Sequence, residues 1–342
     1  MCGSVTSNTV NTAPTITQQP VSQEVCEPDT ATFTVTATGT PVPTYQWFNA
    51  AGAISGATDA SYVTGTAGQY YVVVTNVCGS VTSNTAVLTV STAPTIILQP
   101  VSQEVCEPAT ATFTIEATGI RYPDFQWYSV GTGVLVGEIS ESLTTGVAGS
   151  YYCIVSNGCG AVTSDTATLT VNVVPVITAQ PVSQEVCEPD TATFTVTATG
   201  DPAPTYQWYD GGGAISGATD ASYTTGVAGS YYCVVTNVCG AVTSDTATLG
   251  VNAAPVITEQ PVSQEVCEPD TATFTVSATS VPAPTYQWYD ANGAISGETN
   301  ASYTTGVAGS YYVVVTNICG SVTSDTATLT VNTSPAITQQ PA

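Results

Sequence analysis

One unit of about 80 residues recurs along this chain of 342 residues, and this period sets the first constraint on its fold. The tryptophans recur at spacings of 80, 81 and 80 residues, at Trp47, Trp127, Trp208 and Trp288. A fixed period of this size indicates that each repeat is one structural unit. We therefore predict four complete repeats, at residues 13–92, 93–173, 174–253 and 254–333. Residues 1–12 match the final strand of a truncated preceding repeat, and residues 334–342 match the first strand of a following one.

Within each repeat, apolar residues alternate with polar ones. In residues 31–39, Ala31, Phe33, Val35 and Ala37 take every second place, and threonines occupy most of the others. A period of two is typical of strands that bury one face, and no segment of helical length has a period of 3.6 residues. The pattern predicts an all-β fold in which each repeat is a β-sandwich of about seven short strands.

The composition excludes several classes of function. Arg121 is the only Lys or Arg against 25 Asp and Glu, His is absent, and the net charge is −24. Without basic clusters, we expect neither nucleic-acid binding nor attachment to anionic lipid. Without His or Lys, the usual Ser–His, Cys–His and Schiff-base groups cannot be assembled, so we predict no enzyme and no catalytic residues. No apolar run of about eighteen residues is present, so we predict no membrane span.

Eleven cysteines recur through the repeats. With no His and no CxxC pair, the usual mixed zinc sites are absent, and we predict no metal or cofactor. Regularly spaced cysteines in a Thr-rich and Ser-rich chain favour disulfides made in an oxidising compartment, which predicts an extracellular or cell-surface location. Cys2 begins the sequence CGSVTSNT, which recurs at residues 78–85, so we interpret Cys2 as an ordinary repeat cysteine.

The order of motifs in each repeat resembles the I-set-like immunoglobulin domains found in tandem arrays on bacterial surface proteins. A proline-led first strand is followed by FTVTA, YQW, AGxYY, NxCG and a TATLTV-like final strand. The resemblance covers essentially the whole chain and implies an elongated rod of four immunoglobulin-like sandwiches. It places in each core the repeat's tryptophan and a corner tyrosine, namely Tyr70, Tyr151, Tyr231 and Tyr311.

The chain departs from this family at the disulfide that normally joins the two sheets. The strand-B positions hold Val35, Ile115, Val196 and Val276, and the strand-F positions hold Val72, Cys153, Cys233 and Val313. Because no repeat has both cysteines, the resemblance implies that Cys153 and Cys233 are buried free thiols that pack as small apolar side chains. It also implies shortened middle edge strands, since only 25 residues separate Trp47 from Val72.

The resemblance also implies a pairing for the other cysteines. It places Cys26 at the C-terminal end of its sandwich and Cys78 at the N-terminal end, about 17–20 Å apart, whereas a disulfide needs Cα atoms within about 7 Å. The implied bonds therefore join neighbouring domains: Cys26–Cys159, Cys106–Cys239 and Cys187–Cys319. Cys2, Cys78 and Cys267 would be unpaired here or bonded to neighbouring units. The alternative, a bond within each repeat, needs a different strand order and stays open.

Acidic residues also recur near each predicted junction, as Glu24, Glu27 and Asp29 do in the first repeat. Carboxylates at a domain junction could hold Ca²⁺. No EF-hand spacing is present, however, and a solvated acidic turn is the simpler interpretation. Asn300 and Asn332 fit the N-glycosylation pattern, which is a weak signal by itself.

These features predict a structural role: an extracellular fibre, stalk or cell-surface filament built from disulfide-linked repeats. The expected partners are further repeats of the same protein, through lateral or end-to-end self-association. One alternative is an adhesin whose loops recognise glycans or proteins, and another is the spacer array of a larger secreted enzyme. The motif GAISG recurs in three of the four repeats, and such near identity favours a scaffold over separate recognition sites.

Overall fold

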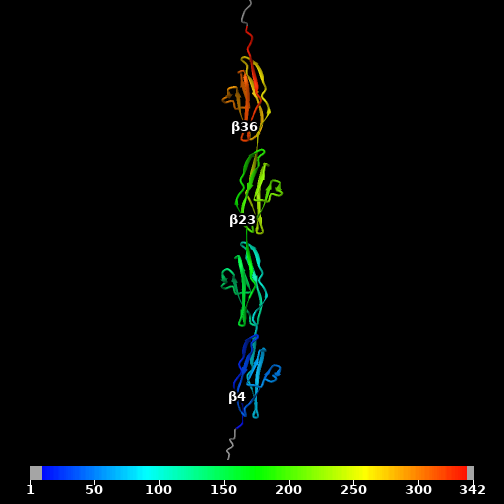
Figure 1. The fold of residues 1–342 in the computed structure, drawn as a ribbon, viewed down its shortest axis with the longest axis vertical. Helices are drawn as coiled ribbons and strands as arrows, with labels where there is room; N and C mark the ends of the chain where they lie inside the picture. The colour runs from blue at the N-terminus through cyan, green and yellow to red at the C-terminus, as the bar shows by residue number, and fades with distance from the viewer. Residues whose placement is uncertain (1–9, 337–342) are drawn as a thin grey trace, which may run out of the picture. The chain divides into compact units, whose positions relative to one another are not determined.

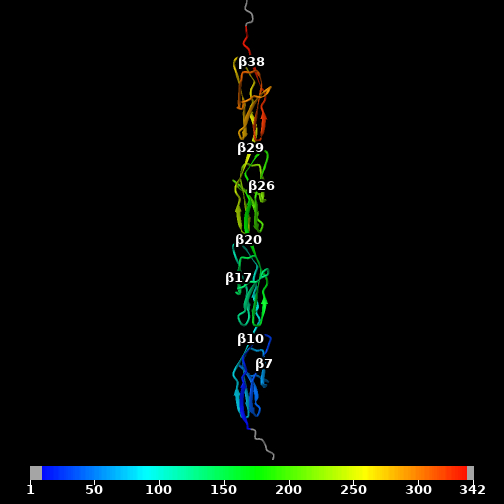
Figure 2. The ribbon, with the colours of Figure 1, turned by 90° about the vertical axis from the view of Figure 1, so that its left-hand side faces the viewer.

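The computed structural model describes residues 10–336, and every regular element in that range is a β-strand. The chain forms two compact units, residues 1–172 and 173–342, and each unit contains two sandwiches (Figures 1 and 2). The predicted terminal strands in residues 1–12 and 334–342 fall largely outside the described range, and Cys2 falls wholly outside it.

The first unit holds the first two repeats. The strands of the first repeat are β1 (Thr12–Gln18), β2 (Gln23–Cys26), β3 (Ala31–Thr34), β4 (Thr36–Thr40), β5 (Thr44–Asn49), β6 (Gly52–Ala53), β7 (Ser61–Thr64), β8 (Gly68–Asn76), β9 (Gly79–Thr82) and β10 (Ala86–Ser91). Those of the second are β11 (Thr95–Leu98), β12 (Gln103–Cys106), β13 (Ala111–Thr114), β14 (Glu116–Thr118), β15 (Asp124–Ser129), β16 (Gly133–Val134), β17 (Ser142–Thr145), β18 (Gly149–Asn157), β19 (Gly160–Thr163) and β20 (Ala167–Ala179).

The second unit holds the third and fourth repeats, and the part of β20 from Val173 onward pairs with β23 there. The other strands of the third repeat are β21 (Gln184–Cys187), β22 (Ala192–Thr195), β23 (Thr197–Asp201), β24 (Thr205–Asp210), β25 (Gly213–Ala214), β26 (Ser222–Thr225), β27 (Gly229–Asn237), β28 (Gly240–Thr243) and β29 (Ala247–Glu259). Those of the fourth are β30 (Gln264–Cys267), β31 (Ala272–Thr275), β32 (Ser277–Val281), β33 (Thr285–Asp290), β34 (Gly293–Ala294), β35 (Ser302–Thr305), β36 (Gly309–Asn317), β37 (Gly320–Thr323) and β38 (Ala327–Asn332).

Each repeat has the same two layers. In the first repeat, the larger sheet has the order β2-β10-β8-β5-β6, with β9 also paired to β8. The opposing layer consists of the pairs β1–β4 and β3–β7, and equivalent strands have the same order in the other three repeats. The middle edge strand β6 is only two residues long, as the short spacing from Trp47 to Val72 predicts.

The apolar side chains of the alternating pattern fill the space between the two layers. Four hydrophobic cores form, one within each predicted repeat. The tryptophans and the strand-B and strand-F positions are all 5% exposed or less. In the first repeat, the Trp47 indole donates a hydrogen bond to the Asp59 carbonyl at 3.0 Å, and the Tyr70 hydroxyl donates one to the Thr66 carbonyl at 2.7 Å. The polar ends of both aromatic side chains are therefore satisfied inside an apolar core.

Strand direction sets which end of a sandwich each cysteine occupies. β10 and β2 are parallel, with Ser91 opposite Cys26 at their C-terminal end. β8 runs antiparallel to β10 and ends at Asn76, so Cys78 lies in the β8–β9 turn at the other end. The two cysteines of the first repeat are therefore kept apart by the length of the sheet.

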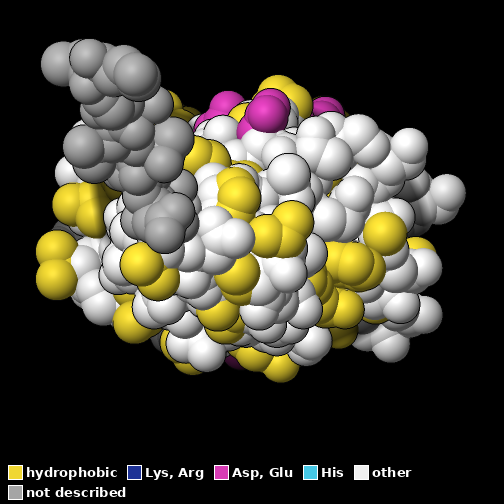
Figure 3. All heavy atoms as spheres, turned by 90° about the horizontal axis from the view of Figure 1, so that it is seen from below, with side chains coloured by type: hydrophobic (Ala, Val, Ile, Leu, Met, Phe, Trp, Pro, Cys, Tyr) yellow, Lys and Arg dark blue, Asp and Glu magenta, His cyan; other side chains and the backbone are white. Residues whose placement is uncertain are grey.

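The surface carries little charge. On the face in Figure 3, hydrophobic side chains are scattered among backbone and other uncharged side chains, and a few acidic side chains lie at one edge. Charged residues make up only 8% of the whole sequence, far below the roughly 25% of an average soluble protein. Uncharged polar residues such as Thr32 and Thr34 of β3 take exposed positions instead.

Candidate functional site

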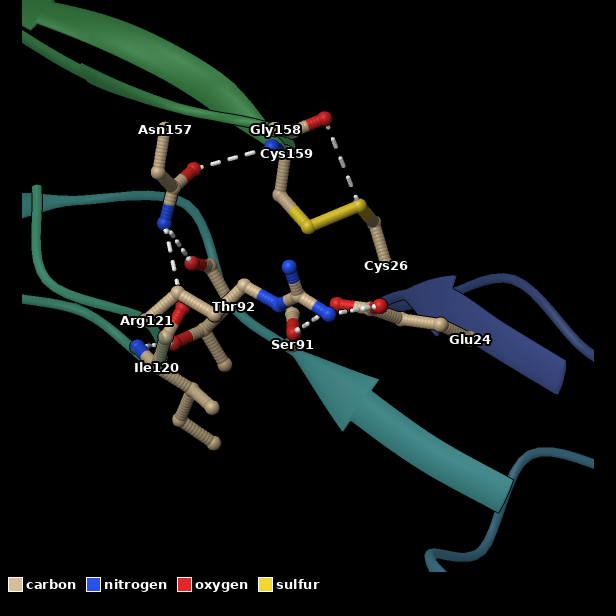
Figure 4. The surroundings of a disulfide bond; sticks show 9 residues. All are labelled: Glu24, Cys26, Ser91, Thr92, Ile120, Arg121, Asn157, Gly158 and Cys159. Atoms are coloured by element: carbon tan, nitrogen blue, oxygen red, sulfur yellow. Dashed lines mark hydrogen bonds and ion pairs between the residues drawn. A yellow bond between two sulfur atoms is a disulfide. The ribbon is translucent and has the colours of Figure 1, made fainter. Parts of the chain in front are cut away.

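A disulfide joins the two sandwiches of the first unit. Cys26, the last residue of β2, is bonded to Cys159 in the turn between β18 and β19, and their Cα atoms are 5.4 Å apart (Figure 4). The two residues are 133 positions apart in sequence. The bond thus connects the C-terminal end of the first repeat to the N-terminal end of the second.

The second unit repeats this arrangement. Cys187, the last residue of β21, is bonded to Cys319 in the turn between β36 and β37, with Cα atoms 5.5 Å apart. Their separation is 132 residues. Cys106 and Cys239 are also disulfide-bonded, and their pairing with each other stays a prediction.

Asparagine side chains hold the turns that carry Cys159 and Cys319. The Asn157 carboxamide accepts a hydrogen bond from the Cys159 amide at 2.9 Å and donates one to the Thr92 carbonyl at 2.8 Å. Asn317 contacts the Cys319 amide and the Ala253 carbonyl at the same two distances. Each turn is thereby tied to the backbone that connects its own repeat to the preceding one.

The other half of each junction is fixed by backbone hydrogen bonds. The Glu27 amide donates to the Ser91 carbonyl at 3.0 Å, which extends the parallel pairing of β2 with β10 past Cys26. The Asp29 amide then donates to the Cys26 carbonyl at 2.7 Å and closes a tight turn. Cys26 therefore projects from a backbone held on both sides, which presets the position of its sulfur.

An ion pair crosses the junction of the first unit. The Arg121 guanidinium, in the loop between β14 and β15, contacts the Glu24 carboxylate on β2 (Figure 4). The Ser91 hydroxyl donates a hydrogen bond to the same carboxylate at 3.1 Å. Because the Arg121 and Glu24 side chains are 68% and 38% exposed, solvent screens this pair and its contribution to stability is small.

Sequence reasoning identified Arg121 as the only basic residue but did not predict this ion pair. Two departures from the repeat consensus would have indicated it. The position of Arg121 holds proline in the other three repeats, and the position of Ser91 holds asparagine in them. A cleft of about 750 Å³ lies beside the disulfide, and Ser91, Arg121 and Glu24 all line it.

The remaining cysteines divide into exposed and buried thiols. Cys78 and Cys267 are free and exposed, whereas Cys153 and Cys233 are free and buried. Burial raises the pKa of the Cys153 and Cys233 thiols by more than the hydrogen bonds from the backbone of Gln126 and Gln207 lower it. Both thiols therefore stay protonated at neutral pH, and their environment does not activate them as nucleophiles.

The acidic residues near the junctions do not form a metal-binding cluster in residues 10–336, where no group of three or more His, Cys, Asp or Glu side chains could hold a metal ion. Glu24 is instead engaged by Arg121 and Ser91. Calcium at the junctions stays the untested alternative to a solvated acidic turn. In the same part of the chain, no helix is long and apolar enough to cross a membrane.

The sandwiches and their topology define the class of this protein: it is a tandem array of immunoglobulin-like domains. The family model "Immunoglobulin domain" matches residues 174–237. A three-domain I-band fragment of titin, I67–I69, superposes with a TM-score of 0.57, covering 70% of this chain and 99% of the fragment at 20% identity. At that identity the likeness to titin shows the fold alone.

Curated relatives share the same kind of sequence. Roundabout homolog 1 of Rattus norvegicus is 30% identical over 260 residues, covering 65% of this chain and 15% of that protein. Hemicentin-1 of Mus musculus is 27% identical over 385 residues, covering 97% of this chain and 7% of that protein. A Xenopus laevis protein named "Cell adhesion molecule-related/down-regulated by oncogenes" is 28% identical over 246 residues, covering 63% of this chain and 19% of that protein. The chain thus spans under a fifth of each relative. All three relatives are animal proteins, so the bacterial origin implied by the resemblance has no support from them.

Proposed function

We propose that this chain is a structural segment of an extracellular fibre, stalk or surface filament whose neighbouring domains are held by disulfides. The observation that carries the proposal is the recurrence of one junction in both units. Cys26–Cys159 and Cys187–Cys319 join equivalent positions with nearly the same Cα separation, 5.4 and 5.5 Å. Because disulfides persist in oxidising compartments, they also support a location outside the cell.

The junction bonds favour a mechanical role because they restrict motion. Neighbouring domains joined by a short linker and a small interface normally move relative to one another. A covalent bond beside the linker adds a second connection and limits that motion. A bond closing a loop of about 130 residues also stabilises the folded pair by about 4–5 kcal/mol in the simple chain-entropy model. An opened domain could extend under tension only as far as the bond allows.

Adhesion is the second candidate function, because one relative carries cell adhesion in its name. In that case, loops at the ends of the sandwiches would contact a glycan or a protein. Substitution of a loop in one repeat would then abolish binding to cells, while the junction bonds stayed intact. The spacer array of a larger secreted enzyme and a bacterial source stay predictions.

Electron microscopy tests the structural proposal. In negatively stained molecules, we expect a narrow distribution of the angle between the first and second domains. The double variant Cys26→Ser/Cys159→Ser should broaden that distribution, while Cys153→Val, which removes a buried thiol, should leave it unchanged. An equally broad distribution in the unaltered protein would overturn the proposal that the bond sets the junction.

A further inference from the structure

We infer that Cys267 and Cys78 are the two unbonded halves of this same junction, and that Cys267 of one molecule forms a disulfide with Cys78 of a second copy. The inference rests on the proposed structural function and names its partner: another molecule of this chain, joined head to tail. Both thiols are free and exposed. Two junctions of this kind are already bonded within the chain, and they provide the template.

The backbone around Cys267 has the arrangement found at a bonded junction. β30 pairs in parallel with β38, which places Cys267 opposite Asn332, just as Cys187 lies opposite Asn252. The amide of the residue after Cys267 donates to the Asn332 carbonyl at 3.0 Å, and the equivalent distance beside Cys187 is 2.9 Å. The turn that follows closes on the cysteine carbonyl at 2.8 Å in both repeats. The backbone of the unbonded half therefore already has the arrangement found beside a bonded cysteine.

Cys78 is prepared in the same way at the opposite end. Its amide donates to the Asn76 carboxamide at 2.9 Å, the distance found at both bonded turns. The Asn76 carboxamide also donates to the Thr12 carbonyl at 2.9 Å, as Asn157 does to Thr92. The hydrogen bonds that shape the turn are thus formed without any disulfide.

Preformed halves matter because they remove the need to order a loop when the bond forms. Bonded cysteines require Cα atoms about 4.4–6.8 Å apart, and the two existing junctions meet this at 5.4 and 5.5 Å. Two halves whose backbones are already held by the same hydrogen bonds can reach this Cα separation when two chains abut end to end. Immobilisation of flexible segments, a common cost of association, is thereby reduced.

The sequence also indicates which existing junction the new one resembles. At the position of Arg121 the first repeat holds Pro41, and at the position of Ser91 the fourth holds Asn332. The contact between copies therefore lacks the ion pair found beside Cys26–Cys159. It resembles the Cys187–Cys319 junction, where the corresponding residues are also proline and asparagine.

Formation of the disulfide needs an oxidant, and a small-molecule disulfide such as glutathione disulfide is suitable. The Cys267 thiolate attacks one sulfur of glutathione disulfide, forms a mixed disulfide and releases one glutathione thiolate. The Cys78 thiolate of a second copy then attacks the Cys267 sulfur and releases the second glutathione. Two protein thiols are oxidised to one disulfide, two glutathione thiols are produced, and the two protons lost by the protein thiols are taken up by glutathione or solvent.

The test uses the full chain with Cys2→Ser in every sample, so that Cys78 and Cys267 are the exposed thiols under study. Samples are incubated in a glutathione redox buffer, run on non-reducing denaturing gels and mapped after peptic digestion. Three proteins are compared: the background protein, Cys78→Ser and Cys267→Ser. We expect a ladder of multimers from the background protein, linked by Cys267–Cys78 peptides.

The two single variants separate head-to-tail joining from random oxidation. Each should stay monomeric by itself, because each retains only one half of the junction. Mixed together, they should form a dimer and no larger species. Dimers of either variant alone in amounts equal to the mixture, or a background protein that stays monomeric, would overturn the inference. If the background protein stays monomeric while Cys26–Cys159 is intact and the distribution of interdomain angles stays narrow, only end-to-end joining is wrong. The proposed structural function is then unaffected.

Discussion

Cys26 and Cys159 are 133 residues apart in sequence, yet their Cα atoms are 5.4 Å apart and their sulfurs are bonded. The first lies at the C-terminal end of one sandwich and the second at the N-terminal end of the next. Two sandwiches therefore share one covalent restraint besides the connecting chain.

Trypsin offers a direct test of this bond, because Arg121 is the only Lys or Arg in the chain. The residue after it, Tyr122, is 99% exposed, so the peptide bond between them is accessible. In a Cys106→Ser variant, we expect the fragments 1–121 and 122–342 to stay joined on a non-reducing denaturing gel. They should separate only after reduction, because Cys26–Cys159 crosses the cleavage site.

The control for that experiment is the variant Cys26→Ser/Cys106→Ser, whose fragments should separate without reductant. Bonds confined to single repeats would give a different result. Cys26 would then be bonded to Cys78, both on fragment 1–121, and the Cys106→Ser protein would already separate under non-reducing conditions.

Arg121 combines an exposed ion pair with unfavourable backbone geometry, since its φ is 67°. Arg121→Ala should lower the free energy of unfolding by about 1 kcal/mol or less, because exposed pairs are weak. Arg121→Gly loses the same ion pair but adopts positive φ freely, so it should be about 1 kcal/mol more stable than Arg121→Ala. Urea denaturation measures both values.

Salt provides the control for the ion pair. At high NaCl concentration the difference between the unaltered protein and Arg121→Ala should shrink, because screening weakens exposed charge pairs. The difference between the alanine and glycine variants should persist, since it arises in the backbone. An alanine variant as stable as the glycine variant would show that the backbone stores no strain at this loop.

The corner tyrosines should each stabilise their own repeat. The Tyr231 hydroxyl donates to the Val227 carbonyl at 2.7 Å, and the side chain is 3% exposed. Tyr231→Phe should therefore lower the free energy of unfolding by about 1 kcal/mol, the usual net value of one hydrogen bond. Tyr232→Phe is a suitable comparison because the Tyr232 side chain is only half-buried, and it should change stability less. Thermal unfolding followed by circular dichroism compares the two variants.

The buried thiols predict a dependence of stability on pH. Because burial raises the pKa of Cys153 and Cys233, the folded state holds these protons more tightly than the unfolded state, where the pKa is about 8.5. The resulting stabilisation is fully present below the unfolded pKa and is lost as pH rises through the folded pKa. Between pH 7.5 and 9.5 the protein should therefore lose stability.

The matched control is Cys153→Val/Cys233→Val, since valine occupies this position in the first and fourth repeats. The variant should lose less stability over the same range, and the gap between the two unfolding temperatures should widen with pH. A gap that stays constant would mean that the thiols do not titrate differently in the folded and unfolded states.

The local pattern of the sequence was sufficient to predict the fold of each repeat. Alternation of apolar and polar residues reports which face of a strand is buried, so Phe33 and Val35 could be assigned to a core before any contact was known, and the family resemblance added Trp47. The repeat period gave the number of sandwiches. Both patterns can be read from the sequence without knowing how neighbouring repeats contact each other.

The tertiary structure decided what lies between the repeats of each unit. Sequence spacing and the family resemblance left two partners open for Cys26. Parallel pairing of β2 with β10 placed it at the end of the sheet opposite Cys78 and beside Cys159. The ion pair of Arg121 with Glu24, 97 residues away, was not predicted at all. Contacts of this kind depend on how the ends of two folded sandwiches meet, and the periodicity within a single strand carries no information about that arrangement.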